Sequence, residues 1–202
     1  MTDLQPHGTL RPGGRTARTR EAVLAAALEE LGSTEFRQLT IDKLAQRSGV
    51  HAATIRRRWR TVDGVVCDLL TERSSFVRFP DTGDFRQDLH ALAEANLEFF
   101  STLRHRNLVE RMVAAAPLDP RAEKLFRDCI DDSSQEANQL VHRAIGRGDL
   151  PPDTDPDAII TALVAPIYYR ILINRRPLEA DLARTSAEAV YHAVQAGAFG
   201  GS

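Results

Sequence analysis

Apolar residues recur at intervals of three and four along most of the chain, which is the spacing of one face of an α-helix. Glycines, prolines and capping residues separate the apolar stretches and mark where one helix stops and the next starts. The predicted helices cover residues 15–31, 41–48, 52–59, 63–76, 89–100, 108–113, 125–145, 157–174 and 181–196. An all-α fold of about nine helices is therefore expected.

The first fourteen residues differ from the rest of the chain. They contain Pro6, Gly8, Pro12, Gly13 and Gly14 and show no apolar periodicity. Segments of this composition do not form a packed core. A disordered tail is expected over residues 1–14.

The second and third predicted helices are separated only by Gly49 and Val50. Two short helices joined by so tight a break form a helix-turn-helix, and glycine at the turn permits a positive φ angle. Leu44, Val50 and Ile55 are expected to form its small core, which Trp59 closes. The outward face then carries His51, Ala52, Arg56, Arg57 and Arg60.

Charge is distributed unevenly along the chain. The first 60 residues carry eleven basic and six acidic side chains, a net charge of +5, whereas the remainder carries fifteen basic and twenty-two acidic ones, a net charge of −7. A basic N-terminal segment followed by an acidic remainder is typical of a protein whose N-terminal segment contacts a polyanion such as nucleic acid. Chance clustering is the alternative, because arginine outnumbers lysine 24 to 2.

Several classes of protein are not supported by the sequence. A chain with 43% hydrophobic and 27% charged residues is typical of a globular protein. The apolar stretch 158–169 is short for a bilayer, and no signal-peptide pattern opens the chain, so a cytoplasmic location is expected. Cys67 and Cys129 lack disulfide or metal-site spacing, and the common motifs of phosphate binding and nucleophilic catalysis do not occur. We expect neither enzyme activity nor a metal or cofactor.

Residues 40–66 carry side chains that agree in type and spacing with a known family. The matching positions are Thr40, Leu44-Ala45, Gly49-Val50, Thr54-Ile55 and Trp59. In these positions the chain resembles the tetracycline-repressor (TetR) family of transcriptional regulators. The resemblance implies a helix-turn-helix DNA-binding domain over residues 15–62 and a ligand-binding and dimerisation domain over residues 63–202.

The same resemblance implies a function. It predicts a repressor that binds palindromic operator DNA as a homodimer and is released by a small-molecule effector. The alternative is a helical ligand-binding or partner-binding protein without site-specific DNA binding.

Three positions depart from the usual pattern of the family. His51 stands where serine is usual, Arg56 where tyrosine is usual, and Val62 where lysine is common. The tyrosine and the lysine contact phosphate in the family. We expect Arg56 and Arg60 to supply those contacts, because guanidinium groups bind phosphate well.

The third helix is expected to enter the major groove. Ala52 and Ala53 are small enough for close approach to the bases, and Arg57 is expected to donate two hydrogen bonds to a guanine. Thr40, Arg56, Arg58 and Arg60 are expected to contact phosphate. Thr54 is expected to contact the DNA backbone or a thymine methyl group. The predicted DNA-binding residues are Thr40, Lys43, His51, Ala52, Ala53, Thr54, Arg56, Arg57, Arg58 and Arg60.

The last two helices are expected to form a dimer interface. Apolar residues cover most of the circumference of the helix predicted over residues 157–174, more than a single core satisfies. The alternative is a fully buried central helix in a monomer. The predicted interface residues are Ile160, Leu163, Val164, Ile167, Ile171, Val190 and Val194.

A pocket for the effector is expected in the acidic remainder of the chain. Aromatic residues at helical spacing belong to a core more often than to a pocket, and this alternative stays open. Tyr168, Tyr169 and Arg170 add directional polar groups, although Tyr169 and Arg170 also suit a dimer contact. The predicted pocket residues are Phe99, Phe100, Met112, Phe126, Tyr168 and Tyr169.

Overall fold

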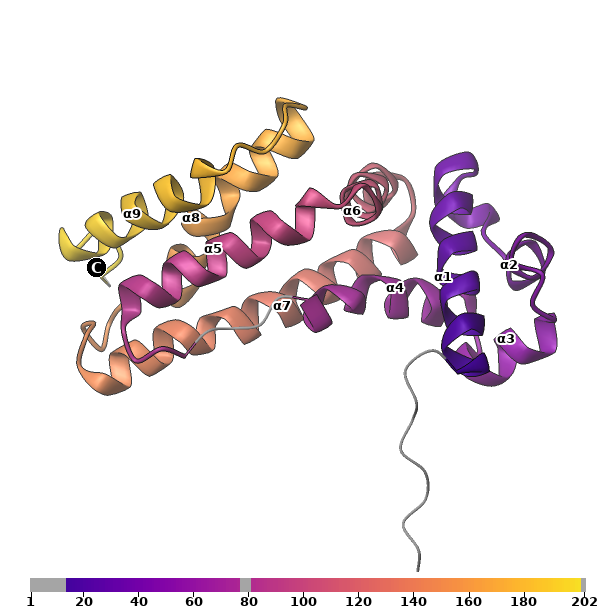
Figure 1. The fold of residues 1–202 in the computed structure, drawn as a ribbon, viewed down its shortest axis with the longest axis horizontal. Coiled ribbons are helices and arrows are strands. Elements are labelled where there is room, and N and C mark those ends of the chain that lie inside the picture. The colour runs from indigo at the N-terminus through magenta and orange to yellow at the C-terminus, as the bar shows by residue number, and fades with distance from the viewer. Residues whose placement is uncertain (1–13, 77–80, 201–202) are drawn as a thin grey trace, which may run out of the picture. The chain divides into compact units, whose positions relative to one another are not determined.

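The structure, a computed structural model, describes residues 14–76 and 81–200. These residues form nine α-helices, and no β-strand occurs among them (Figure 1). The predicted all-α fold is confirmed. The predicted disordered tail over residues 1–14 lies, apart from Gly14, outside the described residues.

The helices group into two compact units, and the boundary between them falls between Leu69 and Leu70. The first unit holds a 3₁₀ turn at Phe36–Gln38 and the helices α1 (Arg15–Ser33), α2 (Ile41–Ser48), α3 (Ala52–Trp59) and the start of α4 (Val62–Phe76). The second unit holds the end of α4 and the helices α5 (Phe85–Ser101), α6 (Leu103–Ala115), α7 (Pro120–Arg147), α8 (Pro156–Tyr168) and α9 (Asp181–Gln195). The functional division at residue 62 stays a prediction.

The first unit is held together by a small apolar core. Leu24 and Ala27 on α1, Leu44 on α2 and Ile55 on α3 are all fully buried. The buried side chains of α1 and α3 lie three or four positions apart, as amphipathic periodicity requires, and α2 adds Leu44. The three helices therefore fold as one packed group.

The second unit is built around α5, α8 and α9, which lie side by side (Figure 1). Leu89 and Phe100 on α5 and Ile167 on α8 are fully buried in their shared core. A buried hydroxyl also joins two of the helices, because Ser186 Oγ on α9 donates a hydrogen bond of 2.6 Å to the carbonyl oxygen of Leu163 on α8. This core fixes the helices that surround the cavity described below.

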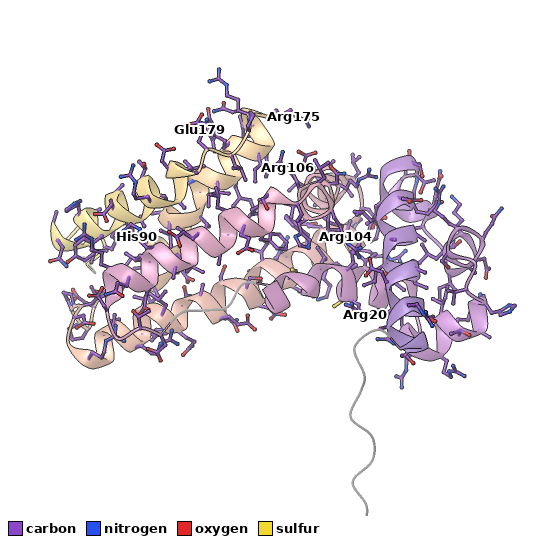
Figure 2. All side chains as sticks on the ribbon, in the orientation of Figure 1. Arg20, His90, Arg104, Arg106, Arg175 and Glu179 are labelled. Carbon is purple, nitrogen blue, oxygen red and sulfur yellow. The ribbon has the colours of Figure 1, made fainter. Side chains whose placement is uncertain are left out.

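The helix predicted over residues 157–174 changes form near its end. The α-helix stops at Tyr168 and continues as a π-helical turn over Tyr169–Ile173, where the amide of Asn174 donates to the carbonyl oxygen of Tyr169 at 3.0 Å. Arg170 then donates to the carbonyl oxygen of Pro177 at 3.1 Å and pairs with Glu179, which Figure 2 labels beside this connection. Arg170 thus closes the link between α8 and α9.

The segment Pro156–Ile173 is long and apolar enough, by length and composition, to cross a membrane. Ile159, Leu163 and Ile167 in this segment are fully buried in the core of the second unit. Packing within the chain accounts for the apolar side chains at the buried positions, which make up 28% of the segment.

Candidate nucleic-acid interface and ligand cavity

The turn between α2 and α3 is fixed by a cap and a glycine. Thr40 precedes α2, and its hydroxyl oxygen accepts a hydrogen bond of 3.2 Å from the amide of Lys43. Gly49 ends α2 with φ of 69° and ψ of 8°, a left-handed conformation that favours glycine. After Val50, α3 begins at Ala52, so the predicted helix-turn-helix forms as expected (Figure 1).

One face of α3 is buried and the opposite face is cationic. Ile55 is fully buried and Trp59 is 9% exposed. Because successive helical residues are about 100° apart, Ala53 and Arg57 lie opposite this buried pair. Arg56 and Arg58 lie on either side of Arg57, and all three arginines are exposed. The methyl group of Ala53 and the guanidinium group of Arg57 therefore occupy the centre of the outward face of α3.

The three arginines of this face differ in their partners. Arg56 pairs with Asp42 on α2 at 2.8 Å, with both side chains more than half exposed. Exposed ion pairs contribute little to stability, so a phosphate can replace Asp42 at small cost. The guanidinium of Arg58 lies over the Trp59 ring, 5.0 Å from its centroid. Arg57 makes neither a hydrogen bond nor an ion pair with any residue that the structure describes.

The other predicted contact residues lie around this helix. Thr40, His51 and Arg60 are exposed, whereas Ala52 and Thr54 are half-buried. Lys43 is placed differently, in a groove that it shares with the end of α1. The structure thus groups nine of the ten predicted residues on the start of α2, the turn and α3, and it turns Lys43 toward α1.

The backbone makes a sharp turn where α3 passes into α4. Arg60 has φ of 61° and ψ of −50°, and the Thr61 amide donates to the Trp59 carbonyl oxygen at 2.6 Å. This is the geometry of a γ-turn, which is strained for a residue other than glycine. The Thr61 hydroxyl accepts from the Gly64 amide at 3.2 Å and so caps α4. The turn leaves Arg60 exposed at the end of α3.

A carboxylate on α4 holds α1 and α3 in place. Asp68 accepts hydrogen bonds from Arg20 on α1 at 2.7 Å and from the indole nitrogen of Trp59 at 2.8 Å (Arg20 is labelled in Figure 2). Burial raises the pKa of Asp68, but the hydrogen bonds from Arg20 and Trp59 outweigh it, and the net pKa is lowered. The ionised carboxylate therefore supports the orientation of α3. Sequence periodicity gave no indication of this contact.

The second unit contains a cavity of about 360 Å³. It lies between α5, α6, α7 and α8, and none of the fourteen described residues that line it is charged. Small-molecule sites are concave and mostly apolar with a few polar groups, and this cavity has that character. It is the candidate effector site.

Two of the six predicted pocket residues, Phe126 and Tyr168, line this cavity. Phe99, Phe100 and Met112 do not line it, because they are buried in the protein interior. Tyr169 is 55% exposed and does not line it either. Helical spacing places all six on apolar or partly apolar faces, but it does not distinguish a face that meets a neighbouring helix from one that borders a cavity.

The sequence reasoning missed the polar residues of the cavity. Asn96 on α5, Ser133 and Ser134 on α7 and Thr161 on α8 all line it. Asn96 is 2% exposed and donates to the carbonyl oxygen of Leu92 at 2.9 Å. A usable signal was present for Asn96, because it interrupts an otherwise apolar helical stripe that includes Leu92 and Phe100.

The predicted dimer residues lie mostly in the interior of the protomer. Six of them are buried in the core of the protomer itself, because α8 and α9 pack against each other and against α5. The seventh, Val164, is half-buried and lines the cavity. The six buried residues are Ile160, Leu163, Ile167, Ile171, Val190 and Val194. These side chains are already used within the chain, so an interface formed by α8 and α9 has to use their outer faces.

Comparison with known proteins gives the family. Residues 79–190 match the family described as "Tetracyclin repressor-like, C-terminal domain". The chain is 29% identical over 180 residues to the uncharacterised HTH-type transcriptional regulator YdeS of Bacillus subtilis, covering 88% of this chain and 90% of that protein. It is also 29% identical over 164 residues to the HTH-type transcriptional regulator AqdR of Rhodococcus erythropolis, covering 81% of this chain and 78% of that protein.

A solved structure agrees with this result. The TetR-family regulator SCO0332 superposes with a TM-score of 0.67 at 24% sequence identity, covering 88% of this chain and 98% of that one. At this identity the likeness concerns the fold. The family match over more than half of the chain, together with the helix-turn-helix at its front, shows that the chain belongs to the tetracycline-repressor family of transcriptional regulators.

Proposed function

We propose that this regulator acts in the cytoplasm as a repressor that binds palindromic operator DNA as a homodimer. Residues 15–62 act as the DNA-binding domain, and residues 63–202 bind the effector and dimerise. A small molecule in the cavity shifts the helices that line it, and α4 carries that shift to the DNA-binding domain because it continues from one unit into the other.

The observation that carries this proposal is the outward face of α3. Ala53 lets the helix approach the floor of the major groove, and Arg57 beside it has no partner among the described residues. Arg56 and Arg58 lie to either side, where the sugar-phosphate backbones border the groove. The arrangement supports base contact by Arg57 and phosphate contact by its two neighbours.

The experiment compares Arg57→Ala with Arg56→Ala. Binding to DNA from the region upstream of the gene and to a scrambled duplex is titrated at several salt concentrations. We expect Arg57→Ala to lose about 1 to 3 kcal/mol of discrimination at one position of each half-site. Arg56→Ala is expected to weaken binding to both duplexes alike and to reduce the salt slope by about one unit.

The matched control is Arg127→Ala, which removes an exposed arginine of α7 in the second unit, outside both the predicted DNA-binding residues and the proposed dimer helices. This variant is expected to bind both duplexes as the wild-type chain does. Equal losses from Arg57→Ala and Arg56→Ala on both duplexes would contradict the assignment of the two arginines. Absence of a discrete, competitor-resistant complex for the wild-type chain would favour a ligand-binding or partner-binding protein without site-specific DNA binding.

The dimer that we propose uses the outer faces of α8 and α9. Tyr169 and Ile173 are 55% and 68% exposed at the end of the α8 segment. Ala189 is exposed on α9, and Ala196 is exposed directly after the helix ends. The small alanine side chains permit close approach of helices, and Tyr169 and Ile173 offer apolar area to bury. Two copies of the helix pair α8 and α9 then form a four-helix bundle about a two-fold axis.

A further inference from the structure

We infer that the cavity of the second unit takes an uncharged, mainly apolar small molecule that carries a hydroxyl or carbonyl oxygen. Only the expected consequence of ligand binding, the release of DNA, rests on the proposed function. The binding itself follows from the lining of the cavity and is tested without DNA.

The shape and size of the cavity limit the ligand. A volume of about 360 Å³ lies near the lower end of the range for small-molecule sites, so the ligand is small. Thr161 and Ala165 on α8 and Val113 on α6 line the cavity and are themselves exposed, so it reaches the surface. A small ligand therefore has a route of entry.

The lining excludes a charged ligand. Leu92, Phe126, Ile130, Ile160 and Leu172 supply an apolar wall, and none of the residues that line the cavity is acidic or basic. A carboxylate or an ammonium group in this position leaves water without gaining a counter-ion. Because an unpaired buried charge is costly, charged molecules are expected to bind far more weakly than neutral ones of the same shape.

Two hydroxyl groups supply the polar contact. Ser134 on α7 and Thr161 on α8 both line the cavity, and neither side chain is hydrogen-bonded to a described residue. Ser133, in contrast, already donates to the carbonyl oxygen of Cys129 at 2.8 Å. A hydroxyl both donates and accepts, so Ser134 and Thr161 suit either an alcohol or a carbonyl oxygen.

The first experiment measures binding of defined probes to the full chain at about pH 7, where carboxylic acids are ionised. The neutral probes are 1-octanol and 2-naphthol, and their charged counterparts are octanoate, octylammonium and 2-naphthoate. We expect at least one alcohol to bind in titration calorimetry and to raise the melting temperature. Its charged counterparts are expected to bind at least about a hundredfold more weakly. Equal or tighter binding of a charged probe, or no binding of either alcohol, would overturn the inference.

The second experiment places the alcohol in the cavity. Val113→Trp puts a large side chain into the lining from α6, and Ala114→Trp puts the same side chain on the neighbouring exposed position outside the lining. We expect Val113→Trp to weaken binding at least about tenfold, since the indole occupies the ligand's space, and Ala114→Trp to leave it unchanged. Equal effects of the two variants would show that the alcohol binds elsewhere.

The third experiment tests the hydroxyls. Ser134→Ala with Thr161→Val keeps the shape of the lining and removes both polar groups, so binding of the alcohol is expected to weaken about two- to tenfold. Thr16→Val, an exposed position on α1, is the control. Unchanged affinity in the double variant would remove the polar contact from the inference.

These results separate the cavity from the function. If an alcohol binds but the chain forms no specific DNA complex, the proposed function fails and the ligand class stands. If the chain forms that complex but neither alcohol binds, the ligand class fails and the proposed function stands.

Discussion

At the scale of single residues, Gly64 shows how closely the backbone is packed where α3 passes into α4. A Cβ atom built at this position would lie 2.4 Å from the carbonyl oxygen of Trp59. Real Cβ atoms do not approach a carbonyl oxygen so closely, and neither backbone segment yields easily. The glycine is therefore needed for space, since its φ is not in the positive range.

We expect Gly64→Ala to lower the free energy of unfolding by about 2 kcal/mol, because the methyl group forces the turn after α3 to move. Chemical denaturation followed by far-UV circular dichroism and by the fluorescence of Trp59, the single tryptophan, measures the change. DNA affinity should fall with it, since Arg60 lies in the same turn.

Gly146→Ala is the matched control for this substitution. Gly146 lies within α7, has no positive φ, and a Cβ added there meets nothing within 4 Å. Alanine is the better helix former by about 0.5 to 1 kcal/mol, so this variant is expected to be as stable as the wild-type chain or more stable. A Gly64→Ala chain as stable as Gly146→Ala would contradict the close approach of Trp59 to Gly64.

Trp59 also shows what the sequence does and does not predict at this scale. Periodicity predicted that Trp59 closes the core of the helix-turn-helix, and it is 9% exposed. The indole nitrogen, however, bonds Asp68 nine positions further along, and Arg20 reaches the same carboxylate from 48 positions away. Contacts between distant positions leave no periodic signal, so periodicity does not identify Asp68 as a contact of Trp59 and Arg20.

At the scale of helices, α5 and α9 are joined at the surface by one carboxylate. Glu188 on α9 accepts from Arg86 on α5 at 2.7 and 3.0 Å, and its Oε1 lies 2.6 Å from His90 Nε2 (His90 is labelled in Figure 2). The hydrogen bond from Arg86 is the largest cause of a lowered pKa, and that from His90 comes next, so the pKa of Glu188 falls to about 2. The ionised form is thus favoured in the folded protein.

This shift predicts a pH dependence of stability. Because the folded-state pKa is lowered, the contribution of Glu188 is fully present above its ordinary pKa of 4.5 and is lost as the pH falls toward about 2. We expect the melting temperature of the wild-type chain to fall more steeply across this range than that of Glu188→Gln. Thermal melts at several pH values measure both slopes.

Glu94→Gln is the control, because Glu94 lies exposed on α5 and is not ion-paired with a described residue. Its melting temperature should follow the wild-type slope. Identical slopes for the wild-type chain and Glu188→Gln would show that the surface contact between α5 and α9 is not formed in solution.

The helix α8 shows why apolar periodicity does not by itself identify an interface. Apolar side chains around most of its circumference indicated a second surface to be covered by a partner. In the structure Leu163 and Ile167 face the core, while Val164 and Tyr168 border the cavity. A cavity wall and a subunit interface both require apolar side chains, and periodicity alone does not distinguish them.

At the scale of the whole molecule, the order of the helices along the chain could be predicted from the sequence. Which helices pack against one another could not. The helix-turn-helix is a local arrangement, so Thr40, Gly49 and Trp59 indicated it directly. The cavity collects side chains from α5 to α8, which are far apart in the sequence. Phe126 and Phe99 both lie on helices of mixed polarity, and only the packing of the whole unit puts one beside the cavity and the other in the interior.

The proposed dimer is a property of the whole molecule, and one substitution tests it. Ala189→Arg places a charge on the outer face of α9, where two copies about a two-fold axis would bring like charges together and bury them. We expect this chain to sediment as a folded monomer and to bind operator DNA at least about a hundredfold more weakly, because each half-site is then bound alone. Ala114→Arg adds the same charge to an exposed position of α6 and should remain dimeric. A stable dimer of Ala189→Arg at micromolar concentration would place the interface on other helices.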